Sequence, residues 1–253
     1  TAAFAFVVTF ASASQDIVID AYRVESLDAE QLAAGAATAT FGWRLGQVGA
    51  GAAGLIMADM FPWVWVYTGM AALVLVGIVA ILLNPEPKTD APEPDRDLAA
   101  WMQDAVVGPF KDFVIRPGWI AIVLFVLLYK FGDAVLSVMK IPFFLEIGFT
   151  KTEIAEIAKV FGFNAIIAGG FLGGLVLART GILTGLMICG VLMAASNLVF
   201  VVQAWAGADL LWLTATIAVE NITTGMGTTA FVAYLSSLCH SAYTATQYAL
   251  LTS

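Results

Sequence analysis

The chain has 253 residues, of which 60% are hydrophobic and 12% are charged, and its formal net charge at pH 7 is −8. Soluble domains carry about 25% charged residues, so this composition and the mean hydropathy of +0.90 exclude an ordinary water-soluble fold. Much of the negative charge is concentrated in one loop, 84–118, and nothing in the chain suggests nucleic-acid binding.

The apolar runs are continuous and about twenty residues long, which suits transmembrane helices, whereas barrel strands would alternate apolar and polar residues. Since lipid admits only helices or closed barrels, the sequence predicts an all-α, polytopic transmembrane bundle. The predicted spans, in chain order, are 2–24, 33–58, 62–83, 119–146, 151–178, 182–205 and 209–238, with a further helical pattern from 241 onward. Short turns separate most of them, at 59–62, 148–150, 179–181 and 206–208.

The first predicted span contains the polar residues Gln15, Asp16 and Asp20 and is followed by Arg23. Asp16 and Asp20 share a helix face at i,i+4, and Asp20 can pair with Arg23 at i,i+3. A carboxylate near hydrocarbon costs roughly 2.5–3.5 kcal/mol, so such acids persist where they face a bundle interior or a water-filled path. We therefore predict a functional role for Asp16. For Asp20 and Arg23, ordinary charges at the inner interface are the open alternative.

The second predicted span places Arg44 near the middle of the membrane. Because its guanidinium stays charged, it must meet a carboxylate, a cavity or an anionic substrate. Structural pairing with Asp16 or Asp20 and binding of a substrate carboxylate both remain open. Small residues recur four apart on one face of this span, which favours tight static packing, with sliding contacts as the alternative. They are Gly42, Gly46, Ala50 and Gly54, and Gly169 with Gly173 repeats the pattern.

The connection 84–118 is long, polar and proline-rich, which favours an extended linker. The spacing of apolar residues from Leu98 to Val106 predicts a short amphipathic helix on the membrane surface, and Gly108-Pro109 ends it. We expect residues 1–83 to form the C-terminal part of one helical half. Residues 119–253 would form the N-terminal part of a second half, with 84–118 as a cytoplasmic linker. Basic residues support this orientation, namely Arg23, Lys88, Arg96, Lys111, Arg116 and Arg179. Lys151 is the clear exception, and Lys140 near the outer face is a candidate second one.

The later spans carry further charged and polar residues well inside their apolar runs. Lys130 and Asp133 stand at i,i+3, so a self-satisfied ion pair is one interpretation. Lys159 is similarly deep in its helix, with Asn164 nearby, and Glu220-Asn221 opens a polar, threonine-containing patch that extends to Ala230. Together with Asp16 and Arg44, the charges would cost roughly 15–20 kcal/mol if unpaired, more than the stability of an ordinary domain. We expect them to converge on one another around a shared polar cavity.

Cys189 and Cys239 lie in or beside apolar segments, so we expect free thiols rather than a disulfide. One histidine and two cysteines offer little material for a metal site, and we predict no cofactor. The chain has no initiator methionine and no signal-peptide pattern, begins inside an apolar run, and ends at Ser253 soon after a helical pattern starts. We expect a part of a longer protein, incomplete at both ends.

Several sequence strings resemble the AmpG-type muropeptide permeases of the major facilitator superfamily, and the resemblance spans essentially the whole chain. The strings are SASQDIVIDA (12–21), GAA (35–37), GWRLG (42–46), NPEP (84–87), AVVGP (105–109), LYKFGDA (128–134), EN (220–221), GMGTTAFVA (225–233) and ATQYALL (245–251). The resemblance implies a proton-driven importer in the bacterial inner membrane. It would carry N-acetylglucosamine–anhydro-N-acetylmuramic acid and its peptide forms to the cytoplasm for peptidoglycan recycling. It also implies twelve to fourteen helices, of which this chain holds about the fourth to the eleventh.

On this interpretation Asp16 and Asp20 couple the proton, and Arg44, Lys130 or Lys159 receives the substrate's carboxylates. A related carrier of another anion, such as an acyl-coenzyme A or a sugar phosphate, is the alternative. A membrane-embedded enzyme is disfavoured, because the lone histidine, His240, lies at a helix end and no HExxH or GxSxG motif occurs. A non-transporting receptor is a further alternative. The expected partners are the muropeptide, protons and the bilayer, with no obligate protein partner.

Overall fold

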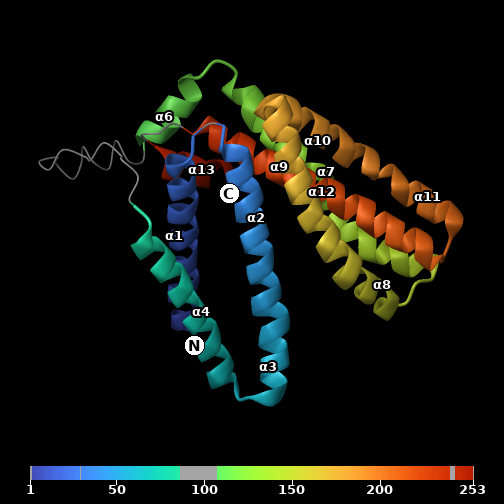
Figure 1. Cartoon of the computed structure of the whole chain (residues 1–253). Helices are drawn as coiled ribbons and strands as arrows, with labels where there is room; N and C mark the ends of the chain where they lie inside the picture. The colour runs from blue at the N-terminus through green and yellow to red at the C-terminus, as the bar shows by residue number, and fades with distance from the viewer. Residues whose placement is uncertain (1, 29, 86–106, 240–242, 253) are drawn as a thin grey trace, which may run out of the picture. The chain divides into compact units, whose positions relative to one another are not determined.

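The computed structural model describes residues 2–28, 30–85, 107–239 and 243–252 (Figure 1). The described residues form helices joined by turns, and no strand occurs among them, which confirms the predicted all-α class. They group into two compact units. The smaller unit is Thr38–Lys88, and the larger unit is Thr1–Ala37 with Thr89–Ser253.

The helices follow the predicted spans closely. In the smaller unit, most of α2 (Leu32–Val48) continues through a π-helical turn, η1 (Gly49–Ala53), into α3 (Gly54–Met60), and α4 (Trp63–Leu83) follows. The larger unit contains the start of α2 and the remaining helices. These are α1 (Ala2–Ser26), α6 (Gly108–Ile115), α7 (Trp119–Ile147), α8 (Lys151–Ile157), the π-helical turn η3 (Ala158–Gly162), α9 (Phe163–Thr180), α10 (Ile182–Ser196), α11 (Leu198–Ala206), α12 (Leu210–Leu238) and α13 (Thr244–Thr252).

Five helices in the described part are long and apolar enough to cross a membrane, namely α1, α4, α7, α8 with α9, and α10 with α11. The segments predicted as spans at 33–58 and 209–238 do form helices but are not among the five. α12 has 29 residues, so its length suffices. Its threonines, glycines and Glu220 make it less apolar, as expected of a helix that faces other helices or a polar path rather than lipid.

The linker region differs in one respect from the expectation. The predicted amphipathic helix at 98–106 lies outside the described residues. Gly108-Pro109 does not end a helix there; it begins α6, with Pro109 in the first turn. Proline fits that position because the first N–H groups of a helix have no partner within it.

The helix ends and turns are determined by capping residues and a glycine that lie next to them in the sequence. Thr150 and Glu153 form a reciprocal capping box at the start of α8, with the Thr150 N–H donating to Glu153 at 2.8 Å. Asp209 caps α12 by accepting hydrogen bonds from the N–H groups of Leu211 and Trp212. α7 ends at Gly148, whose φ of 114° is a conformation that glycine adopts without steric strain. The predicted turns around 148–150 and 206–208 are confirmed.

α9 and α12 lie side by side in the larger unit, with their backbones in close contact (Figure 1). A Cβ atom added to Gly169 would overlap the backbone oxygen of Ile222, and one added to Gly173 would lie 2.8 Å from Met226 Cα. On the other helix, a Cβ on Gly225 would overlap the oxygen of Ile166. The stripe at Gly169 and Gly173 therefore serves tight helix packing, as the sequence favoured.

The small-residue stripe of the smaller unit is less uniform. A Cβ on Gly54 would overlap the end of the flexible Met70 side chain, which brings α3 against α4. At Gly42 and Gly46 a Cβ would meet no described atom within 4 Å. Tight packing is thus seen at one end of this stripe only, within the residues that the structure describes.

A buried polar contact fastens α11 to α12. Gln203, with no exposed surface, donates to the Gly207 carbonyl at 2.8 Å and accepts from the Thr216 hydroxyl at 3.0 Å. Thr216 is likewise fully buried. Such contacts between helices hold the register of the pair, because neither partner can turn to water.

We expect Gln203→Leu to lower the free energy of unfolding by roughly 1–2 kcal/mol, since it leaves the buried Thr216 hydroxyl without its acceptor and removes one of two donors to the Gly207 carbonyl. Thermal unfolding of the detergent-solubilised protein measures this. Thr214→Val is the control, because the Thr214 hydroxyl, within the described part of the chain, bonds the Leu210 carbonyl of its own helix. The double variant with Thr216→Val should regain part of the loss. Equal stability of Gln203→Leu and the control would refute the prediction.

Candidate functional site

Long polar side chains of α7 reach across to α12. Lys130 donates to Asp133 at 3.2 Å and to the Thr228 hydroxyl of α12 at 3.0 Å. The Tyr129 hydroxyl, one residue earlier, donates to the Gly227 carbonyl at 3.3 Å. The predicted Lys130–Asp133 ion pair is thus present within α7, and Lys130 adds a hydrogen bond across to α12. Both side chains keep some exposed surface, 34% for Lys130 and 19% for Asp133.

Further along, an ion pair connects α7 to α12. Lys140 of α7 donates to Glu220 of α12 at 3.4 Å, and the other carboxylate oxygen accepts from the amide of Asn221 at 2.8 Å. The Glu220 side chain is only 10% exposed, while that of Lys140 is 32% exposed. All three residues line a cavity of about 130 Å³. Its other walls include Ile141, Phe144, Ile154, Ala158, Phe200 and Ile217.

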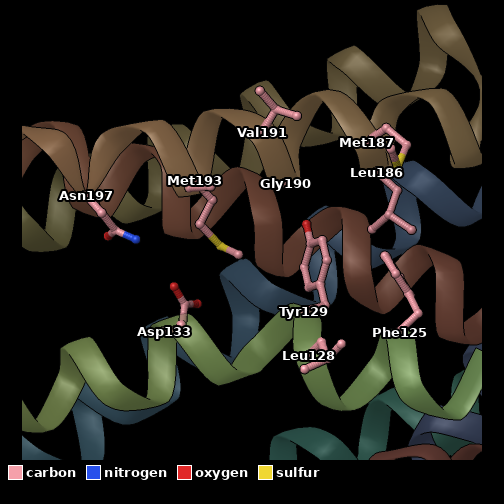
Figure 2. A pocket seen from close by; sticks show the side chains of 12 residues that line it. Phe125, Leu128, Tyr129, Asp133, Leu186, Met187, Gly190, Val191, Met193 and Asn197 are labelled. Carbon is pink, nitrogen blue, oxygen red and sulfur yellow. The ribbon is translucent and has the colours of Figure 1, made fainter.

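A larger cavity of about 330 Å³ lies between α7 and α10. Figure 2 shows the Asp133 carboxylate and the Asn197 amide turned toward the space between the two helices, with Tyr129 and Met193 beside them. The remaining walls are mostly apolar, with Phe125, Leu128, Leu186, Met187 and Val191 among them. Asp133 therefore joins the Lys130 ion pair on one side and borders this cavity on the other.

The acids of α1 occupy different surroundings. Asp20 pairs with Arg23 at 3.0 Å, as its spacing predicted, and Arg23 also donates to the Tyr248 hydroxyl of α13 at 2.9 Å. Asp16 and Gln15 are exposed one turn earlier. Asp16 makes no ion pair within the described part of the chain, but its charge acts on Asp20. α1 thus presents an open carboxylate beside a paired one.

Arg44 belongs to the smaller unit, where its contacts are local. Its guanidinium stacks on the Trp43 ring, 4.7 Å from the centroid, and donates to Gln47 at 3.1 Å. The Nε atom is buried and has no hydrogen-bond partner among the described residues. An unpartnered buried N–H on a permanent cation is an unfilled donor for an acceptor group.

Lys159 stands on η3 and is exposed. It makes no ion pair within the residues that the structure describes, and the nearby Asn164 amide donates back to the Val160 carbonyl at 2.6 Å. Within the larger unit, Lys130 pairs with Asp133, Glu220 pairs with Lys140, and Asp20 pairs with Arg23, so the charges form separate pairs. Asp16 and Lys159 lie outside these pairs.

Another polar cluster, absent from the sequence-based prediction, gathers where α6, α12 and α13 meet. Arg116 donates to the Leu238 carbonyl at the end of α12 and pairs with Asp112 at 2.7 Å. Gln247 of α13, only 1% exposed, donates to the same Asp112 carboxylate at 2.8 Å. The adjacent Cys239 is a free thiol, as is Cys189, and burial raises the pKa of Cys239 to about 12.

Lys140, the partner of Glu220, is not among the site residues predicted from the sequence. Lys130, Asp133 and Lys140 stand at i, i+3 and i+10, so they share one face of α7, and this stripe was the available signal. The described residues contain no group of three or more His, Cys, Asp or Glu side chains able to hold a metal ion. What the arrangement offers chemically is a set of ammonium–carboxylate pairs beside small cavities.

Comparison with known proteins identifies the family. The family model described as "Major Facilitator Superfamily" matches residues 1–253, which is the whole chain. The chain belongs to the Major Facilitator Superfamily. With five apolar helices in the described part, it is a multi-pass membrane protein of the transporter class and a partial bundle of this superfamily.

Curated relatives carry related names. The chain is 39% identical over 252 residues to the anhydromuropeptide permease of Escherichia coli strain K12, which covers 99% of this chain and 50% of that permease. It is 36% identical over 247 residues to a putative transporter AmpG 4 of Rickettsia felis, covering 96% and 59%. The resemblance to AmpG-type members of the superfamily is thus confirmed, and the chain spans about half the length of these relatives.

Proposed function

We propose that the chain forms the central part of a longer, proton-coupled importer of anhydro-muropeptides in the bacterial inner membrane, serving peptidoglycan recycling. The similarity to a permease named for these compounds supports the substrate class. A muropeptide carries carboxylates, so its carrier needs basic groups inside the bundle. It also needs acidic groups that a proton can neutralise.

One observation supports this proposal most directly. Two ammonium–carboxylate pairs lie beside cavities within apolar helices. Lys140–Glu220 joins α7 to α12, while Lys130–Asp133 lies within α7 and its lysine also donates to Thr228 of α12. Charged groups are costly inside a bilayer and mark ion or substrate paths. An ion pair can be exchanged: protonation neutralises the carboxylate, and the ammonium becomes free for a substrate anion. Proton and substrate then favour the same state of the carrier.

We assign the proton to Asp16, with Asp20 as its neighbour on the same face of α1. Arg44, Lys130 or Lys159 binds the carboxylates of the substrate. For Arg44, the buried Nε without a partner supports this role. The proposed halves are 1–83 and 119–253, with 84–118 as a cytoplasmic linker, an orientation supported by the basic residues.

Uptake into vesicles tests the function. Vesicles that contain the complete carrier are given labelled N-acetylglucosamine–anhydro-N-acetylmuramic acid, with and without an inward proton gradient. We expect accumulation above the external concentration only with the gradient, and loss of it when a proton ionophore is added. Uptake that merely equilibrates in both conditions would refute proton coupling, and no specific uptake at all would refute the substrate.

Asp16→Asn should abolish proton-driven accumulation while the carrier still inserts at the wild-type level, because asparagine has the shape of aspartate but takes no proton. The matched control is Asp209→Asn, since Asp209 caps a helix outside the proposed path and asparagine caps helices equally well. Gradient-driven accumulation in Asp16→Asn at the control level would remove Asp16 from the mechanism.

A further inference from the structure

In the cavity at Lys140, the carboxylate and the ammonium of the ion pair differ in how many of their hydrogen-bonding positions have partners. Each oxygen of the Glu220 carboxylate has a partner, Lys140 at 3.4 Å and Asn221 at 2.8 Å. The Lys140 ammonium, with three hydrogens to donate, makes this one hydrogen bond within the described part of the chain. The carboxylate is therefore well held, and the ammonium keeps donors free toward the cavity.

The size of the cavity limits what can enter. At about 130 Å³, it offers the volume of roughly four water molecules at about 30 Å³ each. A carboxylate group fits this space. The apolar walls, among them Phe144, Ile154 and Phe200, suit the short aliphatic stem that carries such a group.

We propose that Lys140 binds one carboxylate of the transported anion. Glu220 remains ion-paired with Lys140 until Glu220 accepts a proton. This inference rests on the proposed function and adds Lys140 and Glu220 to its binding residues. The ligand class is a carboxylate at the end of a larger solute. Asn221 acts as a positioning residue, because its amide fixes the carboxylate that alternates between the ion pair and the protonated form.

The charge balance explains why proton and anion would enter together. With Glu220 ionised, a second carboxylate at Lys140 would place two anions around one ammonium, where low dielectric makes their repulsion strong. Protonation converts Glu220 to a neutral acid, and Lys140 then pairs with the substrate carboxylate. Net charge in the cavity is the same before and after, because one proton and one anion have been added.

The other charges around the pair are few. On α7, Asp133 acts electrostatically on Glu220, although its own hydrogen bond is to Lys130. On α8, Glu153 is engaged with Thr150 in the capping box, and Lys151 and Glu156 are exposed. η3 contributes the exposed Lys159 next to the cavity-lining Ala158, and the described part of α11 contains no charged residue. Lys140 is the basic group in hydrogen-bond contact with Glu220.

The test compares two competitors in the complete carrier. Labelled N-acetylglucosamine–anhydro-N-acetylmuramic acid is the probe, and the same compound serves as unlabelled competitor either as the free acid or with its carboxylate amidated. We expect the wild type to prefer the acid by roughly ten- to a hundredfold, the range of a charge-assisted hydrogen bond. Lys140→Gln should lose this preference. Glu146→Gln and Lys151→Gln are exposed controls that should retain it.

Glu220→Gln gives a second readout. Since glutamine resembles the protonated acid, this variant should still bind the probe and exchange it across the membrane. Its affinity should no longer rise as pH falls, and gradient-driven accumulation should be lost. The control Glu146→Gln should keep both properties. Wild-type pH dependence in Glu220→Gln would overturn the proposal.

A purely structural ion pair predicts something different. In that case the double variant Lys140→Gln/Glu220→Gln, which leaves no buried charge, should recover transport and the acid preference. We expect it to reach the membrane but to remain without that preference. If the single variants fail to insert, the double variant alone decides. A wild-type carrier without proton-driven uptake would refute the proposed function, whereas unaltered variants in an active carrier would refute only this inference.

Discussion

Gly169→Ala is expected to destabilise the protein severely, although it adds a single methyl group. The new Cβ would overlap the backbone oxygen of Ile222, and no rotamer change can relieve a clash with backbone. α9 and α12 must then separate along their closest contact, where a Cβ on Gly225 would meet α9 in the same way. Overpacking costs typically about 1–3 kcal/mol, and we expect a value at or above the upper end.

The neighbouring glycine supplies the control. At Gly170, an added Cβ would have its nearest contact at 3.4 Å, to the Thr229 hydroxyl oxygen. Gly170→Ala should therefore leave the midpoint of thermal unfolding in detergent nearly unchanged, or raise it, since alanine favours helix. Indistinguishable midpoints for the two variants would show that α9 and α12 do not pack through Gly169.

Arg116→Met is expected to loosen α6 and α13 from the end of α12. Arg116 donates to the Leu238 carbonyl and pairs with Asp112, which in turn accepts from the buried Gln247 amide of α13. Removing the guanidinium deletes the Arg116–Asp112 ion pair and the Arg116 hydrogen bond to the Leu238 carbonyl, at a cost of roughly 1–3 kcal/mol. Hydrogen exchange of the backbone amides of α6 and α13 should accelerate by tenfold or more.

Arg116→Lys and Lys111→Met separate charge from geometry. Lysine keeps the charge but lacks the planar fork that serves two acceptors at once, so we expect an intermediate effect. Lys111 lies exposed on the same helix, and its loss should leave exchange at the wild-type rate. If Arg116→Met also exchanges at that rate, the cluster does not hold the three helices together.

The parts of the fold that depend only on residues close together in the sequence were predictable from it. Continuous apolar runs gave the helices, and residues such as Thr150 and Gly148 gave the turns, because capping and left-handed backbone are local properties. The Lys130–Asp133 pair was likewise predictable from i,i+3 spacing. Lys140 was not assigned to Glu220, since their contact depends on how α7 is rotated against α12, and one sequence carries no information on that rotation.

The same limit applies to the glycines and to the linker end. The stripe at Gly169 and Gly173 indicated a close helix contact, but the partner, Gly225 on α12, follows only from the packing. From the sequence alone, Arg116 was interpreted as one of the basic residues that indicate membrane orientation. Its hydrogen bond to Leu238 joins residues 122 positions apart, which local spacing does not reveal.

The coupled movement of proton and substrate is tested most directly without any imposed gradient. The complete carrier is reconstituted in weakly buffered proteoliposomes, and N-acetylglucosamine–anhydro-N-acetylmuramic acid is added outside while the external pH is recorded. We expect an immediate alkalinisation that follows substrate entry, is absent in protein-free liposomes, and is abolished in Asp16→Asn and Glu220→Gln. Substrate entry with no change in external pH would contradict proton-coupled import through these residues.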